Sequence, residues 1–233
     1  MIAPAAREAD PWDRRLRWLY LAAGAVGLLA AATLLIEKIE ILEDPGYVPP
    51  CNISPIISCG SVMTTAQAEI FGFPNPLLGI AAFPVVLTTA MALFAGARLA
   101  RWYWNGLLVG STAGVVLIHW LMFQSLYRIG ALCPYCMAVW VVVIPTFWYT
   151  ALRQARTSTL IADSPAAGAV RLASEYHGVV LTSWYLIIAA LICMVPASEM
   201  RSRRTISARA VSIGVLFNDA NAVTRMRAPS SSR

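Results

Sequence analysis

The amino-acid sequence predicts an all-α integral membrane protein with five membrane-spanning helices and an outer loop that carries a short surface helix. Two observations support this fold class. Of the 233 residues, 58% are hydrophobic and only 13% are charged, whereas a soluble domain carries about 25% charged residues. The chain also contains five long blocks without Asp, Glu, Lys or Arg, each able to supply the roughly 20 apolar residues that cross a bilayer. These blocks are residues 18–36, 70–97, 102–127, 129–152 and 176–198.

Each block marks one predicted helix. We place these helices at about 17–39, 76–97, 102–127, 134–152 and 178–196. Asn75 and Pro76 suit the N-cap and first residue of the second helix, since proline is tolerated where the backbone N–H has no helical partner. Residues 153–175, which contain Pro165 and Gly168, are expected to form a connection between the last two helices.

A polar, proline-rich segment separates the first two predicted helices. Within it, the stretch SVMTTAQAEI places Val62, Ala66 and Ile70 at positions i, i+4 and i+8. This spacing gives one apolar face to a short helix that can lie on a membrane surface.

The chain divides into an N-terminal lead (1–16), one membrane domain (17–200) and an Arg/Ser-rich tail (201–233). Seven of the 18 basic residues lie in the tail with one aspartate, and the rest of the chain is neutral. The basic character therefore belongs to a segment that we expect to be disordered, and it gives no case for nucleic-acid binding.

Basic residues in the short loops predict a cytoplasmic N-terminus. Nine of them then lie inside, and only Lys38 and Arg128 lie outside. The loop 37–76 and the turn 128–133 face the outer side of the cell membrane, where disulfides persist. Five crossings also put Arg201 and its neighbours outside, so the sequence leaves open whether the fifth helix spans fully. The nine inner residues are Arg7, Arg14, Arg15, Arg17, Arg98, Arg101, Arg153, Arg156 and Arg171.

Two cysteine pairs fall on the predicted outer side: Cys51 with Cys59, and Cys133 with Cys136. Because Pro134 suits the first helical position, Cys133 lies at the positive end of a helix dipole, which lowers a thiol pKa. Cys136 lies about 4.5 Å deeper along the axis. The pattern predicts a redox pair with one sulfur at the aqueous loop and the other toward the apolar bundle. Such a pair suits electron transfer between a dithiol in water and an acceptor in lipid.

Other readings of the polar and sulfur-bearing residues stay open at this point. The four thiols suit inert disulfides or a four-cysteine metal site, although Cys51 and Cys59 lack the short zinc-knuckle spacing. Cys193 has no partner in the sequence and is expected to pack inside the bundle. His119, within a predicted span, is either a hydrogen-bonded neutral residue or part of a proton relay.

Three motifs together resemble the vitamin K epoxide reductase family, most closely its bacterial disulfide-forming members. They are CNISPIISCGSVM, FGFPNPLLG and CPYC opening a later helix, and the resemblance covers about residues 17–152. It implies a four-helix bundle around a quinone (menaquinone or ubiquinone), capped by the outer loop, with a fifth helix beside it. It also implies that Cys133 and Cys136 form the active-site pair, with Cys136 next to the quinone, and that Cys51 and Cys59 shuttle electrons to Cys133.

The resemblance assigns further residues to the quinone pocket. Asn75 matches an asparagine that hydrogen-bonds a quinone carbonyl, and a plain helix cap is its other reading. Leu78 and Trp140 match positions that line the ring, and packing is their other reading. Thr65 stands where the family usually has a serine, so a hydroxyl is kept.

The resemblance implies a membrane thiol-disulfide oxidoreductase that supports disulfide formation outside the cytoplasm. It would reoxidise a thioredoxin-fold partner and pass electrons to a quinone. About 35 polar residues follow the last helix without a Cys-x-x-Cys, so we expect the partner to be a separate, DsbA-like extracytoplasmic protein. A vitamin K epoxide or quinone reductase and a membrane metal-binding protein are the alternatives.

Overall fold

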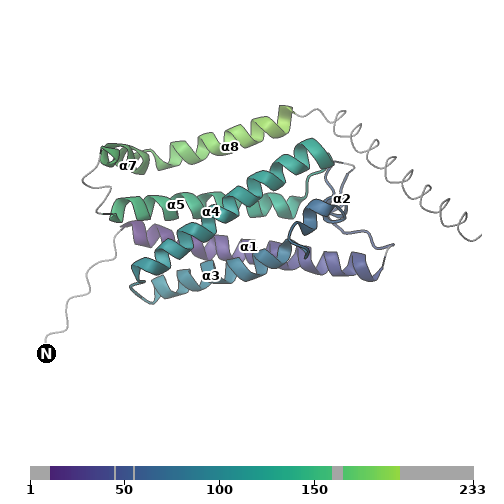
Figure 1. The fold of residues 1–233 in the computed structure, drawn as a ribbon, viewed down its shortest axis with the longest axis horizontal. Coiled ribbons are helices and arrows are strands. Elements are labelled where there is room, and N and C mark those ends of the chain that lie inside the picture. The colour runs from purple at the N-terminus through teal and green to yellow at the C-terminus, as the bar shows by residue number, and fades with distance from the viewer. Residues whose placement is uncertain (1–10, 45, 55, 159–164, 195–233) are drawn as a thin grey trace, which may run out of the picture.

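The computed structural model describes residues 11–44, 46–54, 56–158 and 165–194 as a set of long helices running side by side (Figure 1). Among these residues, five helices are long and apolar enough to cross a membrane, which confirms the predicted all-α membrane fold. They are α1 (Pro11–Glu43), α3 (Pro76–Phe94), α4 (Arg101–Gln124), α5 (Pro134–Thr157) and α8 (His177–Met194).

Small residues bring α1 and α3 into close contact along their length. A Cβ atom on Gly24 of α1 would lie 2.8 Å from the backbone nitrogen of Leu87 on α3. A Cβ on Gly79 of α3 would lie 2.6 Å from the Cβ of Ala31 on α1. Such close approach is typical of helix packing in membranes, where apolar side chains gain nothing by leaving lipid and tight packing supplies the attraction.

A hydrogen bond buried in the bundle joins α1 to α5. The Tyr20 hydroxyl and the Thr150 Oγ1 lie 2.7 Å apart, and both residues are fully buried. The Thr150 hydroxyl donates to the Thr146 carbonyl, so Tyr20 is the donor to Thr150. Because the Tyr20 hydroxyl would otherwise be unsatisfied in an apolar interior, this bond favours the way the two helices face each other. The helix α4 packs on α5, which completes the four-helix core.

The helix bounds differ from the sequence prediction mainly where charged residues begin. The helix α1 starts at Pro11 rather than 17 and ends at Glu43 rather than 39, and α5 continues to Thr157 rather than 152. A block without charges marks the part of a helix that suits lipid, but Arg and Glu are good helix formers and continue the helix beyond it. The helix α3, in contrast, is shorter than predicted. It ends at Phe94 rather than 97, two residues before Gly96, which has a positive φ of 77°.

The connection predicted at 153–175 also contains helix. Its first residues belong to α5, and Ala166–Glu175 form α7. The predicted third helix ends at Gln124, and a π-helical turn, η2 (Ser125–Ile129), follows it and closes at Gly130 with φ 69°. Residues 195–196 of the predicted fifth helix and the whole tail 201–233 lie outside the described residues.

The prediction of a single surface helix over residues 61–70 is wrong. The chain forms α2 (Cys59–Met63) and a 3₁₀ helix, η1 (Ala66–Glu69), and the two are separated at Thr64 and Thr65. The Thr65 backbone is extended, and both threonine hydroxyls donate to carbonyls of the preceding turn, at Gly60 and Val62. Side chains that bond to nearby backbone in this way compete with helix continuation. We call residues 59–69 the cap.

A short backbone pairing ties the outer loop to the turn before α5. Ile57 and Leu132 form a parallel bridge. The Ser58 N–H donates to the Leu132 carbonyl at 2.9 Å, and the Leu132 N–H donates to the Ile56 carbonyl at 2.7 Å. Because Cys59 lies two residues after Ile57 and Cys133 one residue after Leu132, the bridge brings the two cysteines to the same place.

The helix α8 docks on the core through polar contacts. The Trp184 indole N–H donates to His119 Nε2 at 3.0 Å, and His119 Nδ1 lies 2.8 Å from the Val115 carbonyl. A nitrogen that accepts from an indole N–H carries no proton, so Nδ1 bears the proton and donates to that carbonyl. Both ring nitrogens of His119 are therefore engaged, as expected for a neutral histidine bonded within the bundle.

Cys193 does not pack inside the bundle as expected, since it is exposed on α8. The helix α8 contacts the core along one side only, and several of its large apolar side chains are exposed as well. Leu186 and Ile187 are examples, at 63% and 60%. In a membrane protein such a surface faces lipid, which suits an apolar residue as well as a protein interior does.

Candidate active site

Four cysteines gather at the end of the bundle where α2, the start of α5 and the end of α1 meet (Figure 1). Cys51 and Cys59 form a disulfide, and Cys133 and Cys136 are free thiols. The Cys133 thiol donates a hydrogen bond to the Cys59 sulfur, with the two Sγ atoms 3.3 Å apart. The structure thus brings both predicted pairs together and selects Cys59 as the loop cysteine that faces Cys133.

The two facing sulfurs are closed off from solvent. Cys59 is 0% exposed and Cys133 is 1% exposed, while Cys51 is 7% exposed. Cys51 is therefore the member of the loop pair nearer the surface. A thiol that reached the site from water would meet Cys51 before Cys59.

Cys133 is the N-cap of α5, with Pro134 at the first helical position. Its sulfur accepts a hydrogen bond from the Cys136 backbone N–H at 3.5 Å. The Cys136 side chain and the backbone N–H groups of Cys136 and Tyr135 lower the pKa of Cys133 below that of an ordinary thiol, against an opposing effect of burial. Cys133 therefore forms a thiolate more readily. This makes it a better leaving group, and near neutral pH a larger fraction of Cys133 is present as the nucleophilic thiolate.

Cys136 lines a cavity of about 520 Å³ that lies between α3, α4 and α5 beneath the cap. This volume falls within the roughly 300–1,000 Å³ of typical small-molecule sites. The lining is predominantly apolar, and it also includes all four residues that the sequence assigned to a pocket: Thr65, Asn75, Leu78 and Trp140. His119 is not among the lining residues.

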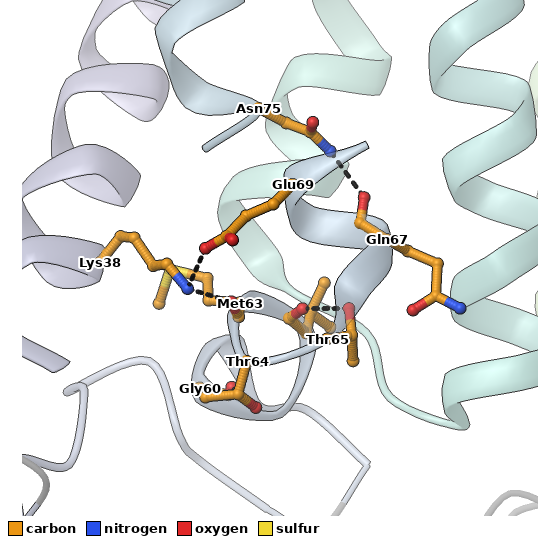
Figure 2. Close-up of polar contacts among 9 residues, drawn as sticks. Lys38, Gly60, Met63, Thr64, Thr65, Gln67, Glu69 and Asn75 are labelled. Atoms are coloured by element: carbon orange, nitrogen blue, oxygen red, sulfur yellow. Dashed lines mark hydrogen bonds and ion pairs between the residues drawn. The ribbon is translucent and has the colours of Figure 1, made fainter. Parts of the chain in front are cut away.

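Asn75 stands where the cap meets α3, but its side chain does not cap the helix. Its Nδ2 donates to the Gln67 carbonyl at 2.8 Å instead (Figure 2), and its backbone N–H donates to the Ala68 carbonyl at 2.8 Å. A carbonyl only accepts, so this bond fixes which end of the amide is oxygen. Asn75 Oδ1 is buried and has no hydrogen-bond partner among the described residues, so it is an acceptor available to a ligand in the cavity.

The other predicted pocket residues differ in burial and in what their polar groups do. Trp140 is buried at 5% exposure, and Leu78 is half-buried on α3. The Thr65 hydroxyl donates to the Val62 carbonyl at 2.7 Å within the cap (Figure 2). Thr65 thus shapes the roof of the cavity with its hydroxyl proton already used.

Sequence reasoning missed two charged residues at the end of α1. Lys38 Nζ lies 2.8 Å from Glu69 Oε1 and donates to the Met63 carbonyl at 2.9 Å (Figure 2). The neighbouring Glu37 accepts a hydrogen bond from the Tyr47 hydroxyl at 2.8 Å, which raises the pKa of Tyr47. The sequence signal for these residues was a charged pair, Glu37 and Lys38, directly after an apolar span. In the sequence alone, this pair marks only the end of the span.

Glycines open one side of the cavity. Gly106 and Gly110 lie one helical turn apart on α4 and line the cavity, and a Cβ at either position would meet no atom within 4 Å. The cavity therefore continues along α4 toward the end of the bundle opposite the cysteines. Among the described residues, no group of three or more His, Cys, Asp or Glu side chains is arranged to hold a metal ion.

A comparison with models of protein families gives a match. The family model described as "Vitamin K epoxide reductase family" matches residues 18–151, which contain both cysteine pairs, the cap and the cavity. None of the curated proteins compared with the chain matches it. The matched segment is more than half of the chain and supports an oxidoreductase embedded in a membrane. The chain belongs to the vitamin K epoxide reductase family.

Proposed function

We propose that this protein reoxidises a thioredoxin-like protein through its two cysteine pairs and passes the electrons to a membrane quinone. The observation that carries this proposal is the 3.3 Å contact between Cys59 and Cys133, combined with the cavity that Cys136 lines. One pair thus meets an aqueous loop and the other meets an apolar cavity. The overall reaction moves two electrons and two protons from two partner thiols to the quinone, which leaves as quinol.

The relay begins at the loop pair. A partner thiolate attacks Cys51, forms a mixed disulfide with it and releases the Cys59 thiolate. The partner's second thiol then displaces Cys51, so the partner leaves oxidised and the loop pair is reduced. Cys51 is the proposed entry point because Cys59 is fully buried and already faces Cys133.

The second exchange takes place between the pairs. The Cys59 thiolate attacks Cys133 of an oxidised Cys133–Cys136 pair and releases the Cys136 thiolate. Cys51 then attacks Cys59, which restores the loop disulfide and releases Cys133. Thiol–disulfide exchange is reversible, so the contact seen between a Cys133 thiol and an oxidised loop pair serves this step in either direction.

The residues around the cavity fit a quinone. The lining is apolar, Trp140 and Leu78 border it, and Asn75 offers the one buried acceptor without a partner among the described residues. Bound there, a quinone supplies a two-electron acceptor beside Cys136. Asn75 Oδ1 suits a quinol O–H, and the second Nδ2 hydrogen, which the Gln67 bond does not use, suits a quinone carbonyl.

The orientation in the membrane follows from the basic residues of the short loops. We infer that the N-terminus lies in the cytoplasm and that the cap and all four redox cysteines lie at the outer face. A separate extracytoplasmic thioredoxin-fold protein is then the natural electron donor, because the outer side is where protein disulfides are made.

The test is quinone reduction by the purified full-length protein, driven by a reduced thioredoxin-like oxidase and followed by quinone absorbance. Alanine replaces Cys51, Cys59, Cys133 and Cys136 one at a time, and Cys193→Ala serves as the control. We expect each of the four variants to lose turnover with the protein donor, while the control keeps it. Wild-type protein that fails to reduce menaquinone or ubiquinone refutes the proposal, and full turnover in Cys136→Ala refutes the assignment of Cys136.

A further inference from the structure

Lys38 is a buried lysine with a defined pair of partners. Its exposed fraction is 7%, although lysine is among the residues least often buried. Burying an ammonium group is costly unless it is paired and hydrogen-bonded. The two partners are the Glu69 carboxylate at 2.8 Å and the Met63 carbonyl at 2.9 Å (Figure 2).

Both partners belong to the cap. Met63 ends α2 and Glu69 ends η1, so one side chain from α1 holds the end of each short helix. These helices have five and four residues, well below the roughly 12–15 residues at which an isolated helix is even marginally stable. Their position therefore depends on anchors outside the cap. Lys38 supplies the anchor from α1, and Asn75 supplies the anchor from α3 through Gln67 and Ala68.

The cap forms the roof of the cavity. Met63, Thr65, Gln67 and Ala68 line it, whereas Lys38 itself does not. Lys38 thus touches the roof from behind and has no direct contact with the space a ligand would fill. Any effect of Lys38 on the ligand must act through the position of the cap.

The redox cysteines have a separate anchor. The bridge between Ile57 and Leu132 precedes the cap and sets Cys59 beside Cys133. It uses backbone hydrogen bonds only, so it does not depend on Lys38. Lys38 therefore holds Met63 and Glu69 without contributing to the backbone pairing that places Cys59 beside Cys133.

We propose that Lys38 is a positioning residue that keeps the cap closed over the cavity and so retains the quinone, without taking part in thiol exchange. This inference rests on the proposed function, because it assigns the quinone to the same cavity. It predicts that loss of Lys38 raises the KM for quinone and leaves the exchange between Cys59 and Cys133 intact.

Four variants of the full-length protein test this proposal: Lys38→Met, Glu69→Gln, the double variant, and Arg128→Gln as a matched loss of an exposed positive charge at the same end of the bundle. With a short-tailed ubiquinone, we expect Lys38→Met to raise KM about tenfold and to change kcat less than twofold. Glu69→Gln should show a smaller rise because the Met63 bond remains, and Arg128→Gln should match wild type.

The double variant distinguishes a displaced cap from a general folding defect. Glu69→Gln leaves the buried Lys38 ammonium without its carboxylate, whereas the carboxylate that Lys38→Met leaves behind is 42% exposed. The double variant removes the buried charge as well, so a defect caused by an unpaired buried charge would be relieved in it. A KM that stays raised in a folded double variant supports the proposal. A KM that returns to the wild-type value, or one that never rises in Lys38→Met, overturns it.

A second measurement does not need quinone turnover. With the loop disulfide intact and no quinone added, we expect a membrane-permeant maleimide to label Cys136 about tenfold faster in Lys38→Met than in wild type, since an open roof exposes the cavity. Wild-type protein without quinone reductase activity would refute the proposed function alone. Equal labelling rates in the two proteins would refute the role of Lys38.

Discussion

Two variants that each keep Cys133 and a single loop cysteine test which loop sulfur reaches Cys133. In a Cys193→Ser background, Cys51→Ala with Cys136→Ala leaves Cys59 and Cys133 as the remaining thiols, and Cys59→Ala with Cys136→Ala leaves Cys51 and Cys133. The Cys59 and Cys133 sulfurs already lie 3.3 Å apart. A disulfide bond is about 2.05 Å long, so the first variant needs an approach of only about 1.2 Å.

The second variant must bring in a sulfur that points at a position now occupied by alanine. Since misplacement of reacting groups by about 1 Å can cost about 100-fold in rate, we expect the first variant to cross-link about 100-fold faster under the same mild oxidant. The assay quenches with a maleimide at timed intervals and measures the uncoupled thiols by intact-protein mass. Equal cross-linking rates in the two variants would refute the assignment of Cys59 as the partner of Cys133.

Three further predictions follow from other contacts. Cys136→Ala removes the largest influence that lowers the pKa of Cys133, so iodoacetamide labelling of Cys133 should need a higher pH than in wild type. An unchanged pH profile would show that Cys136 does not lower the pKa of Cys133. Gly110→Leu fills open space in the cavity, so KM should rise about tenfold or more for long-tailed quinones and little for short-tailed ones, and an equal rise for both would place the tail elsewhere. Gly24→Leu meets the Leu87 backbone at 2.8 Å and should lower the stability in detergent by about 1–3 kcal/mol, whereas Gly110→Leu should leave thermal unfolding unchanged; similar losses in both would contradict the packing argument.

Much of the site was readable in the sequence because its signals are local. Pro134 after Cys133 marks the start of a helix, and the structure places Cys133 at the N-cap. Three residues along a helix place Cys136 deeper, and it lines the cavity. Asn75 and Trp140 came from the resemblance of whole motifs, and they line the same cavity, although their contact with a quinone stays a proposal.

Other parts of the site lay beyond local patterns. The apolar spacing of Val62, Ala66 and Ile70 predicted one surface helix, but the threonine hydroxyls between them divide it into α2 and η1. Exposure of Cys193 depends on which side of α8 meets the core, and a helix that is apolar nearly all round carries little signal for that choice.

The sequence by itself determined the all-α membrane class of the protein, its five candidate bilayer spans and the proposal of a redox role for the two cysteine pairs. Charge-free blocks and the Cys-x-x-Cys spacing are properties of neighbouring residues, and hydrophobic burial and helix geometry act on them directly. Only the tertiary structure decided that Cys59 rather than Cys51 faces Cys133, and that Lys38 binds Glu69 on the cap. These contacts join residues 74 and 31 positions apart, so they depend on how the helices and the loop bridge assemble, which no short stretch of the chain encodes.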